Sequence, residues 1–367
     1  MSLKLRKYQE GDEKNILALD ATLMKRPKID TLKKWQWEFT KNPRGDSQIT
    51  VYEVNDKIVG VYNLIPIKFS YNDHNFNTGR SVYAMMHPKY GIYYNRFVNL
   101  VKEGSNFSDF DFIWTISNQG TMASQIKAGY THIGNYETIF KILDVDKISN
   151  TYSEALLKKQ TLVRLAKFLA KAVFPVIDIF FNFNRDTKNS KLKIIEITSF
   201  DHRFDTLWER VHDKFGITIT RDSTFLNWRF IHNPNNSYKI FATTKNEALT
   251  GYIVLSSYYS NKIEIGVIND ILYDPSDKKN YRTLIDYAIQ YFRSRNASSI
   301  MFLIIKKGKR YSNFLKFLKM RGFLFNNKRL TAPILILKNN KSLSINEKVD
   351  DLKEWYLTFA FTEGIRF

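Results

Sequence analysis

The densest group of chemically active side chains in the sequence is basic. Between Lys278 and Arg329 lie 14 lysine and arginine residues and a single acidic residue, Asp286. Concentrated positive charge attracts phosphates and other acidic groups. We therefore interpret residues 278–329 either as a solvated surface or as a site for an anionic ligand. Tyrosines among the basic residues would also suit nucleic acid, but we do not expect nucleic acid to be the partner.

Other groups that commonly carry out chemistry are missing or wrongly spaced. The 367 residues include no cysteine, which excludes disulfides, Fe–S clusters and thiol nucleophiles. The six histidines show no spacing typical of metal ligands, so we expect no metal site. Motifs of P-loop, Rossmann, G-x-S-x-G and H-E-x-x-H type do not occur either.

Length and composition describe a folded chain with room for two domains. The mass is 43.3 kDa and the formal net charge is +20, while 44% of the residues are hydrophobic. The first residues contain no apolar segment of the kind found in secretory signals, and no run of about 18 apolar residues occurs. These features predict a soluble, cytoplasmic, basic protein.

The sequence contains an internal repeat. The segment WEFTKNP that begins at Trp37 recurs as WRFIHNP at Trp228, an offset of 191 residues, and Gly60 and Gly251 share this offset. Residues 81–88 (SVYAMMHP) align with 268–275 (INDILYDP) at an offset of 187. Since the matches keep their order along the chain, we predict two copies of one fold.

The repeat and the hydrophobic pattern together predict the domain organisation. Both copies are expected to consist of a strand, two helices, three strands, a helix, a strand, a short helix and a final strand. The final strands are placed at 138–143 and 333–338. The predicted segments are an N-terminal lobe, a basic helical linker, a C-terminal lobe and a C-terminal tail: 1–146, 147–191, 192–340 and 341–367.

The linker allows two interpretations. Leu162, Leu165 and Phe168 recur at helical spacing, with Arg164 and Lys167 interspersed. Such a helix can pack its apolar stripe between the lobes and leave its lysines in water. It can also make a peripheral membrane contact on an anionic surface.

Several motifs, in this order, resemble the GNAT superfamily of N-acetyltransferases in its tandem form. They are WQWEF running into Asn-Pro (35–43), KIVG entering a strand (57–60), MMHPKY (85–90), Ser-Asn (117–118), AGYTHIG (128–134), and Arg-Asp with LNWRF in the second copy (221–230). The resemblance implies an α/β (α+β) fold of two tandem GNAT-like lobes. Each lobe would hold a mixed, mostly antiparallel sheet flanked by helices.

The same resemblance implies an activity. It indicates an acyl-CoA-dependent N-acyltransferase that uses acetyl-CoA or another acyl-CoA as co-substrate. The acceptor would be an amino sugar or another small polar amine. A tyrosine of the family that protonates the leaving thiolate is replaced here by Ser124, and the family's glycine-rich loop is shortened before Gly91.

The resemblance also assigns candidate site residues in the first lobe. The cofactor-binding candidates lie where the third strand of the expected three-strand run meets the central helix: Met85, Met86, His87, Tyr90, Gly91 and Ile92. The catalytic candidates are Asn118, His87 and Ser124, and His132 is a second candidate base. Structural roles remain open for Asn118 as a cap, for Gly91 as a turn and for His87 at a strand end.

Two further functions remain open. A catalytically silent GNAT-like binding module for an acidic or phosphorylated partner would explain the shortened loop and the missing tyrosine. An aminoacyl-tRNA-dependent transferase is a third hypothesis, because that class also uses paired GNAT-like lobes.

Overall fold

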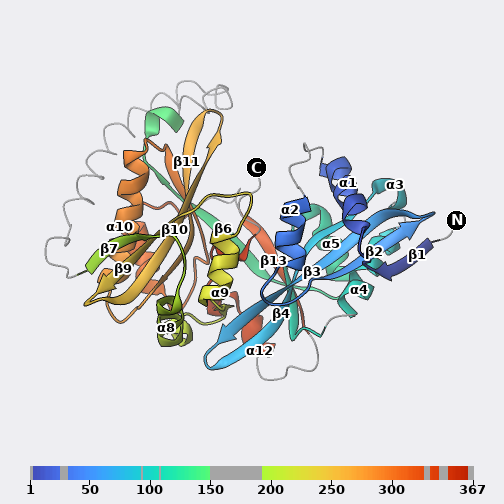
Figure 1. The fold of residues 1–367 in the computed structure, drawn as a ribbon, viewed down its shortest axis with the longest axis horizontal. Helices are drawn as coiled ribbons and strands as arrows, with labels where there is room; N and C mark the ends of the chain where they lie inside the picture. The colour runs from blue at the N-terminus through green and yellow to red at the C-terminus, as the bar shows by residue number, and fades with distance from the viewer. Residues whose placement is uncertain are drawn as a thin grey trace. The chain divides into compact units, whose positions relative to one another are not determined.

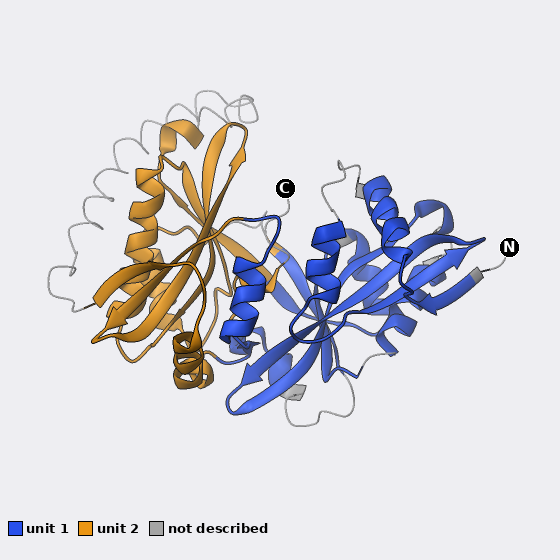
Figure 2. Ribbon diagram, in the orientation of Figure 1, with its two compact units in different colours: residues 1–135, 216–236, 332–355 blue, residues 136–215, 237–331, 356–367 orange. Residues whose placement is uncertain are grey.

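The structure is a computed structural model that describes residues 3–24, 32–91, 94–106, 109–148, 192–325, 331–338 and 346–362. The chain forms two compact units, coloured separately in Figure 2. Unit 1 comprises residues 1–135, 216–236 and 332–355, and unit 2 comprises 136–215, 237–331 and 356–367. Residues 149–191, which include nearly all of the expected linker helix, lie outside the described residues.

Unit 1 is built on a mixed, mostly antiparallel sheet (Figure 1). Its strands follow the order β1-β2-β3-β4-β5-β13, and the short β8 pairs with β3. Among these pairings only β4–β5 is parallel. The strand bounds are β1 (Leu3–Lys7), β2 (Gln48–Val54), β3 (Lys57–Tyr71), β4 (His74–Met86), β5 (Phe112–Ile116), β8 (Thr218–Ile219) and β13 (Thr331–Lys338).

Helices flank this sheet. The helix α4 packs against β2 and β3, and α1 lies against β3. The helical bounds in unit 1 are α1 (Asp12–Met24), α2 (Leu32–Trp35), the π-helix η1 (Gln36–Thr40), α3 (Pro88–Gly91), α4 (Tyr94–Asn106), α5 (Gln119–Lys127), α9 (Ser223–Leu226), the π-helix η5 (Asn227–Ile231), α12 (Asn346–Val349) and the 3₁₀-helix η6 (Leu352–Glu354).

Unit 2 repeats the arrangement, with strand order β7-β9-β10-β11-β12-β6 and β11–β12 as its parallel pair. Helix α10 packs on β9, β10 and β11 (Figure 1). The bounds are β6 (Thr131–Ile142), β7 (Leu192–Ile197), α8 (His202–Val211), η4 (His212–Lys214), β9 (Lys239–Lys245), β10 (Ala248–Ser260), β11 (Ile263–Tyr273), α10 (Lys279–Ser294), β12 (Ser299–Ile304), α11 (Ser312–Met320) and η7 (Phe359–Phe361). In the described part of the chain, no helix is long and apolar enough to cross a membrane.

The closing strands are exchanged between the repeats. The final strand of the first repeat, β6, pairs with β12, and the final strand of the second repeat, β13, pairs with β5. The strands expected at 138–143 and 333–338 therefore exist, but each completes the sheet of the other repeat. Each compact unit thus contains segments of both sequence repeats. The lobe limits 1–146 and 192–340 remain a prediction about the repeat itself.

Asparagine-led turns explain why these strands form consecutive hairpins. Two-residue loops connect β2 to β3, β9 to β10 and β10 to β11, and both loop residues have positive φ in every case. Asparagine tolerates this left-handed conformation, which matches the twist of the flanking strands. The loop residues are Asn55 and Asp56, Asn246 and Glu247, and Asn261 and Lys262.

The repeated glycines mark a close approach between helix and sheet. A Cβ built on Gly60 would lie 3.2 Å from a Leu100 methyl carbon of α4, and one on Gly251 would lie 3.1 Å from a Leu284 methyl carbon of α10. The same offset of 191 residues therefore places glycine at one packing contact in both repeats. A larger residue would push the central helix away from the sheet.

The repeated tryptophans form a reciprocal pair inside unit 1. Trp37 Nε1 donates to the carbonyl of Trp228 over 2.8 Å, and Trp228 Nε1 donates to the carbonyl of Trp37 over 2.9 Å. Their rings stack with centroids 5.1 Å apart. The buried π-helices η1 and η5 thus bind each other through equivalent residues, which gives the sequence repeat a structural role.

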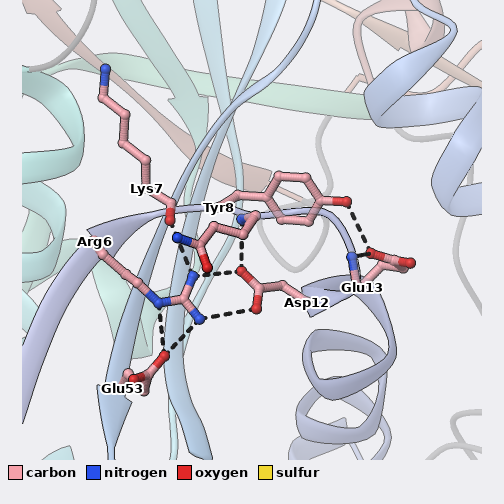
Figure 3. Close-up of polar contacts among 8 residues, drawn as sticks. Arg6, Lys7, Tyr8, Asp12, Glu13 and Glu53 are labelled. Carbon is pink, nitrogen blue, oxygen red and sulfur yellow. Dashed lines mark hydrogen bonds and ion pairs between the residues drawn. The ribbon is translucent and has the colours of Figure 1, made fainter. Parts of the chain in front are cut away.

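A charged cluster attaches β1 to α1 (Figure 3). Arg6 binds both carboxylate oxygens of Asp12, at 2.6 and 3.0 Å, and its Nε donates to Glu53 on β2 at 2.7 Å. Burial opposes ionisation of Asp12, but the hydrogen bond from Arg6 outweighs it and the pKa of Asp12 is lowered. Tyr8 donates to Glu13 at 2.9 Å, and burial with this bond raises the pKa of Tyr8 to about 12. These bonds fix the start of α1 on the sheet.

Candidate functional site

Unit 1 contains a fork between two parallel strands. β4 pairs with β5 only from Thr78 to Arg80, and β4 then continues to Met86 beside β3 alone. The Thr115 hydroxyl donates to the Ser81 carbonyl over 3.1 Å, where the strands separate. Beyond Ser81, the edge of β4 that faces β5 has no strand partner among the described residues, and backbone groups at such an edge can bind an extended ligand.

A β-bulge lies on β4 at this fork. Val61 opposes Met85 and Asn63 opposes Val82, so Tyr62 faces two residues of β4. One of the two, Tyr83, has a φ of +51°, which is strained for an aromatic residue. Its ring packs edge-on against Phe39 with centroids 5.5 Å apart. The bulge turns β4 locally and accompanies its separation from β5.

The expected cofactor residues line the end of β4. Met85 is buried, and Met86 is partly buried against the core cluster that includes Val59 and Leu100. The His87 amide donates to the Val59 carbonyl over 2.7 Å, and Tyr90 also packs on this cluster. Gly91 ends α3, and Ile92 lies outside the described residues.

The imidazole of His87 is oriented by the loop. Its Nδ1 accepts the amide hydrogen of Lys89 over 3.2 Å, and its ring lies edge-on to that of Tyr90. Because Nδ1 is an acceptor, neutral His87 carries its proton on Nε2. The side chain is therefore arranged as a hydrogen-bond donor at Nε2.

The catalytic candidates on the other side of the fork belong to α5. Asn118 is its N-cap, with Oδ1 accepting from the amide of Thr121 over 3.0 Å. This is the capping role that the residue type favours, and it leaves the Nδ2 hydrogens as the possible donors. Ser124 is buried further along α5, whereas His132 on β6 is exposed and contacts Asn135. Because parallel strands end at one edge, the topology brings His87 and Asn118 to the same fork.

A chain of buried hydroxyls lies beneath the fork. The phenols of Tyr62 and Tyr130 share a hydrogen bond, and Tyr62 also contacts the Ser105 hydroxyl of α4 over 3.1 Å. Ser105 in turn donates to the Val101 carbonyl. Burial raises the pKa of both phenols, and the Ser105 and Ser81 hydroxyls act in the opposite sense. Sequence reasoning missed Tyr62, since nothing in its strand pattern distinguishes it from a core residue.

Unit 2 has an equivalent fork, but its own chain occupies it. β11 pairs with β12 only as far as Ile268. Past this point Tyr356 donates to the Ile271 carbonyl over 2.6 Å, and Thr358 donates to the Asp270 carboxylate over 2.7 Å. Asp270 is fully buried and also accepts from Tyr252 at 2.7 Å. The segment 356–361 therefore contacts the part of β11 that corresponds to β4 beyond Ser81.

The loop that follows β11 is also closed to anions. The carboxylate of Asp274 accepts the amide hydrogen of Ser276, and that of Asp277 accepts the amide hydrogen of Lys279 at the start of α10. The bond from Lys279 lowers the pKa of Asp277. Despite burial, the bonds from Ser276 lower that of Asp274. The amides that could hold a diphosphate are therefore already bound by carboxylates.

The basic segment 278–329 is partly neutralised by ion pairs in unit 2. Arg321 contacts Asp286 at 2.7 Å, and Lys306 and Arg295 bind Glu137 and Glu264. Other basic residues of the segment are exposed: Lys278, Lys307, Lys316 and Lys319. Within the described residues no group of three or more His, Cys, Asp or Glu residues could hold a metal ion.

Comparison with solved structures identifies the fold. The chain superimposes on a GCN5-related N-acetyltransferase from Anabaena variabilis with a TM-score of 0.59 and 11% identity, covering 91% of this chain and 72% of the other. A tandem GNAT protein from the clavulanic acid biosynthesis pathway gives 0.55 and 10%, with coverages of 92% and 98%. The fold is therefore that of the GNAT superfamily, as the sequence motifs imply.

A third similar structure is Saccharomyces cerevisiae N-myristoyltransferase with bound myristoyl-CoA. Its TM-score is 0.53 at 11% identity, and the match covers 92% of this chain and 82% of the enzyme. No family model and no curated protein sequence matches the chain. The chain and these solved structures thus share their fold. Their sequence identities are too low to align individual site residues.

Proposed function

We propose that the protein is an acyl-CoA-dependent N-acyltransferase whose acyl donor binds at the fork of unit 1. The observation that supports this most directly is the separation of β4 from β5 beyond Ser81, next to the bulge at Tyr83. An open strand edge can hydrogen-bond the amide groups of a pantetheine chain. GNAT and myristoyltransferase neighbours with the same architecture add support for an acyl-CoA donor.

The electrostatics of the fork favour a diphosphate-bearing ligand. No acidic residue occurs between Asp73 and Glu103, while Lys89 and Arg96 lie in this stretch. In our proposal Met85 and Met86 contact the acyl donor, and His87 with α3, including Tyr90 and Gly91, holds its phosphates; Ile92, outside the described residues, remains a predicted contact. Backbone amides at a helix start favour anions.

The transfer step requires an amine that has lost a proton and a thiolate that gains one. The amine nitrogen forms a bond to the acyl carbon as the carbon–sulfur bond breaks. The proton that the amine nitrogen releases on forming the amide balances the one that the departing thiolate takes up. The Nε2 hydrogen of His87 can stay on the ring and hydrogen-bond the acyl oxygen while this oxygen carries negative charge, and Asn118 Nδ2 can orient the acceptor. Ser124 would serve the acceptor side only through hydrogen bonding, because a serine hydroxyl is too weak an acid to replace a phenol.

The acceptor in this proposal is an amino sugar or another small polar amine. Isothermal titration calorimetry with acetyl-CoA, CoA and a longer acyl-CoA tests donor binding first, with one ligand expected per chain. Release of free thiol with a panel of amino sugars and simple amines then tests transfer. Failure of every acyl-CoA to bind at millimolar concentration would exclude the proposal and favour a silent binding module. Strongly salt-dependent tRNA binding would instead favour the tRNA-dependent transferase.

A further inference from the structure

The helix α11 of unit 2 carries positive charge on the side that does not pack into the core. Its exposed side chains in the second half of the helix are Lys316, Lys319 and Met320. A spacing of three and four residues places these side chains on one face of the helix. The opposite side buries four apolar residues, which are Phe314, Leu315, Phe317 and Leu318.

Exposed apolar side chains lie beside these lysines. Met320 is 52% and Leu324 is 55% exposed, and they are two of five exposed large hydrophobic side chains among the described residues. Leu324 is held by two backbone hydrogen bonds with Phe140 of β6, of 2.6 and 3.3 Å. Lys319 Nζ lies 5.2 Å from the centre of the Phe325 ring, which places residues 324–325 next to the lysine face of α11. We call Lys316, Lys319, Met320, Leu324 and Phe325 the α11 patch.

Positive charge continues from the α11 patch onto helix α10. Arg282 is exposed, and its guanidinium lies 5.6 Å from the centre of the Phe317 ring of α11. The single acidic residue of the segment 278–329, Asp286, is bound by Arg321 through two hydrogen bonds of 2.7 and 2.8 Å. The segment therefore has no further carboxylate of its own to offset its exposed cations.

The exposed groups favour a lipid surface over nucleic acid as the partner of this charge. Stacking on nucleic-acid bases needs exposed aromatic rings, but Tyr281 and Tyr311 are only 3% and 4% exposed, and Tyr287 and Tyr291 pack against Phe241 of β9. Exposed aliphatic side chains among lysines suit an interface of acyl chains and anionic headgroups. The aliphatic groups can enter its apolar part while the ammonium groups stay at the phosphates.

We propose that the α11 patch binds the surface of a membrane that contains anionic lipids. The lysine ammonium groups pair with lipid phosphates, and the exposed side chains of Met320 and Leu324 leave water on binding. The repeat offset of 193 places Ala123 and Ile126 of α5 opposite Lys316 and Lys319. The pair of lysines is therefore particular to the second repeat.

Flotation of the full chain with lipid vesicles tests the class of the partner. The vesicles contain phosphatidylcholine alone or with about 30% phosphatidylglycerol, and the salt concentration is raised from about 50 to 300 mM. Binding to the anionic vesicles is expected to be at least about tenfold stronger than to the neutral ones and to weaken as salt rises. Equal binding to both, or binding to neither, would overturn the proposal. The assay contains no acyl-CoA, so its outcome does not depend on the function of the fork.

Two double variants separate the charged from the apolar part of the α11 patch. Lys316→Glu combined with Lys319→Glu should weaken binding to the anionic vesicles by about twentyfold or more, because each cation at such a surface contributes about fivefold. Met320→Ser combined with Leu324→Ser should weaken binding about fivefold or more and leave the salt dependence unchanged. An unchanged thermal midpoint of unfolding shows that each variant is folded.

Lys57→Glu combined with Lys262→Glu is the matched control, since it changes the net charge equally at two exposed positions outside the α11 patch. Glutamate suits the turn position of Lys262, because Glu247 has the same φ of 67° in the preceding hairpin. The control should bind anionic vesicles about as the unmodified chain does. Equal losses in the control and in the lysine variant of the α11 patch would reduce the effect to net charge and overturn the proposal.

Two further outcomes would assign the binding elsewhere. Unchanged vesicle binding in both variants of the α11 patch would place the membrane contact in another segment, such as the linker 147–191, and would contradict the proposal. Tighter binding of an oligothymidine of about 20 nucleotides than of anionic vesicles, abolished by Lys316→Glu with Lys319→Glu, would assign the α11 patch to nucleic acid instead.

Discussion

Both units contain a fork between two parallel strands, but the surroundings of the forked strand differ between them. In unit 1, β4 leaves β5 after Arg80, and no strand of the described chain pairs with the part of this edge beyond Ser81. In unit 2, β11 leaves β12 after Ile268, but Tyr356 and Thr358 bind its exposed backbone and its buried carboxylate. In unit 2 the chain thus covers the end of the forked strand with its own segment 356–361, and in unit 1 no described strand covers the equivalent part of β4.

The residues at and after the forked strands also differ in charge between the two units. The alignment of residues 81–88 with 268–275 places His87 opposite Asp274 and Tyr83 opposite Asp270. Carboxylates therefore stand in unit 2 where unit 1 has an imidazole and a phenol. A carboxylate binds the local amide hydrogens itself and repels phosphate, and this difference is the reason that our proposal places the acyl donor in unit 1.

The largest expected effect is a loss of stability at the fork of unit 2, which the segment 356–361 covers. Asp270→Ala removes the acceptor of both the Tyr252 and the Thr358 hydroxyl and should destabilise unit 2 by about 3 kcal/mol. Hydrogen exchange of residues 356–361 should accelerate in parallel. Tyr83→Gly, at the aligned position in unit 1, should cost about 1 kcal/mol or less, because glycine lacks the Cβ that makes the positive φ unfavourable and this gain offsets the lost contact with Phe39. Equal losses in both variants would contradict the distinction between the forks.

A smaller effect, on acyl-CoA affinity, is expected for substitutions of His87 and Asp274 next to the forks. His87→Asp introduces into unit 1 the carboxylate that closes unit 2, and acyl-CoA affinity measured by calorimetry should fall about tenfold. The reverse change, Asp274→His, should leave the stoichiometry at one ligand per chain because the segment 356–361 still occupies the fork. A second bound acyl-CoA in Asp274→His would show that the loop alone closes unit 2.

An effect of similar size is expected for the phenols beneath the fork of unit 1. The repeat offsets of 191 and 193 place Ile253 and Phe323 of unit 2 opposite Tyr62 and Tyr130. Tyr62→Phe and Tyr130→Phe should each cost about 1–2 kcal/mol by leaving the other hydroxyl short of a partner, and the double variant should cost less than their sum. Additive losses would argue against a shared bond. Tyr52→Phe, in the same core, is the control.

The raised pKa values of Tyr62 and Tyr130 predict that the stability of the fold decreases at alkaline pH. Their pKa values are raised in the folded protein, so the unfolded chain releases these protons first as the pH rises. The stabilisation is complete below about pH 10 and is lost as the pH climbs toward the folded pKa values. Urea unfolding between pH 8 and 11 should show a weaker pH dependence in the double phenylalanine variant, and an unchanged slope would exclude this origin.

Much of the fold could be predicted because local signals and tertiary packing agree. The offset that pairs Gly60 with Gly251 marks a real helix–sheet contact, and the one that pairs Trp37 with Trp228 marks a real reciprocal bond. The candidate site was harder to predict. Asn118 carries the same chemistry whether it caps a helix or orients a substrate, and its hydrogen bond to Thr121 appears only in three dimensions.

The sequence by itself determined the duplication, the order of strands and helices, and the place where charge accumulates, because these depend on periodicity, turn residues and composition. Only the tertiary structure decided which sheet each closing strand completes and which forked strand the segment 356–361 covers. Strand exchange and the filling of a cleft by a distant segment depend on pairing between residues far apart in the chain. A pattern along one strand specifies that it pairs, but not with which partner.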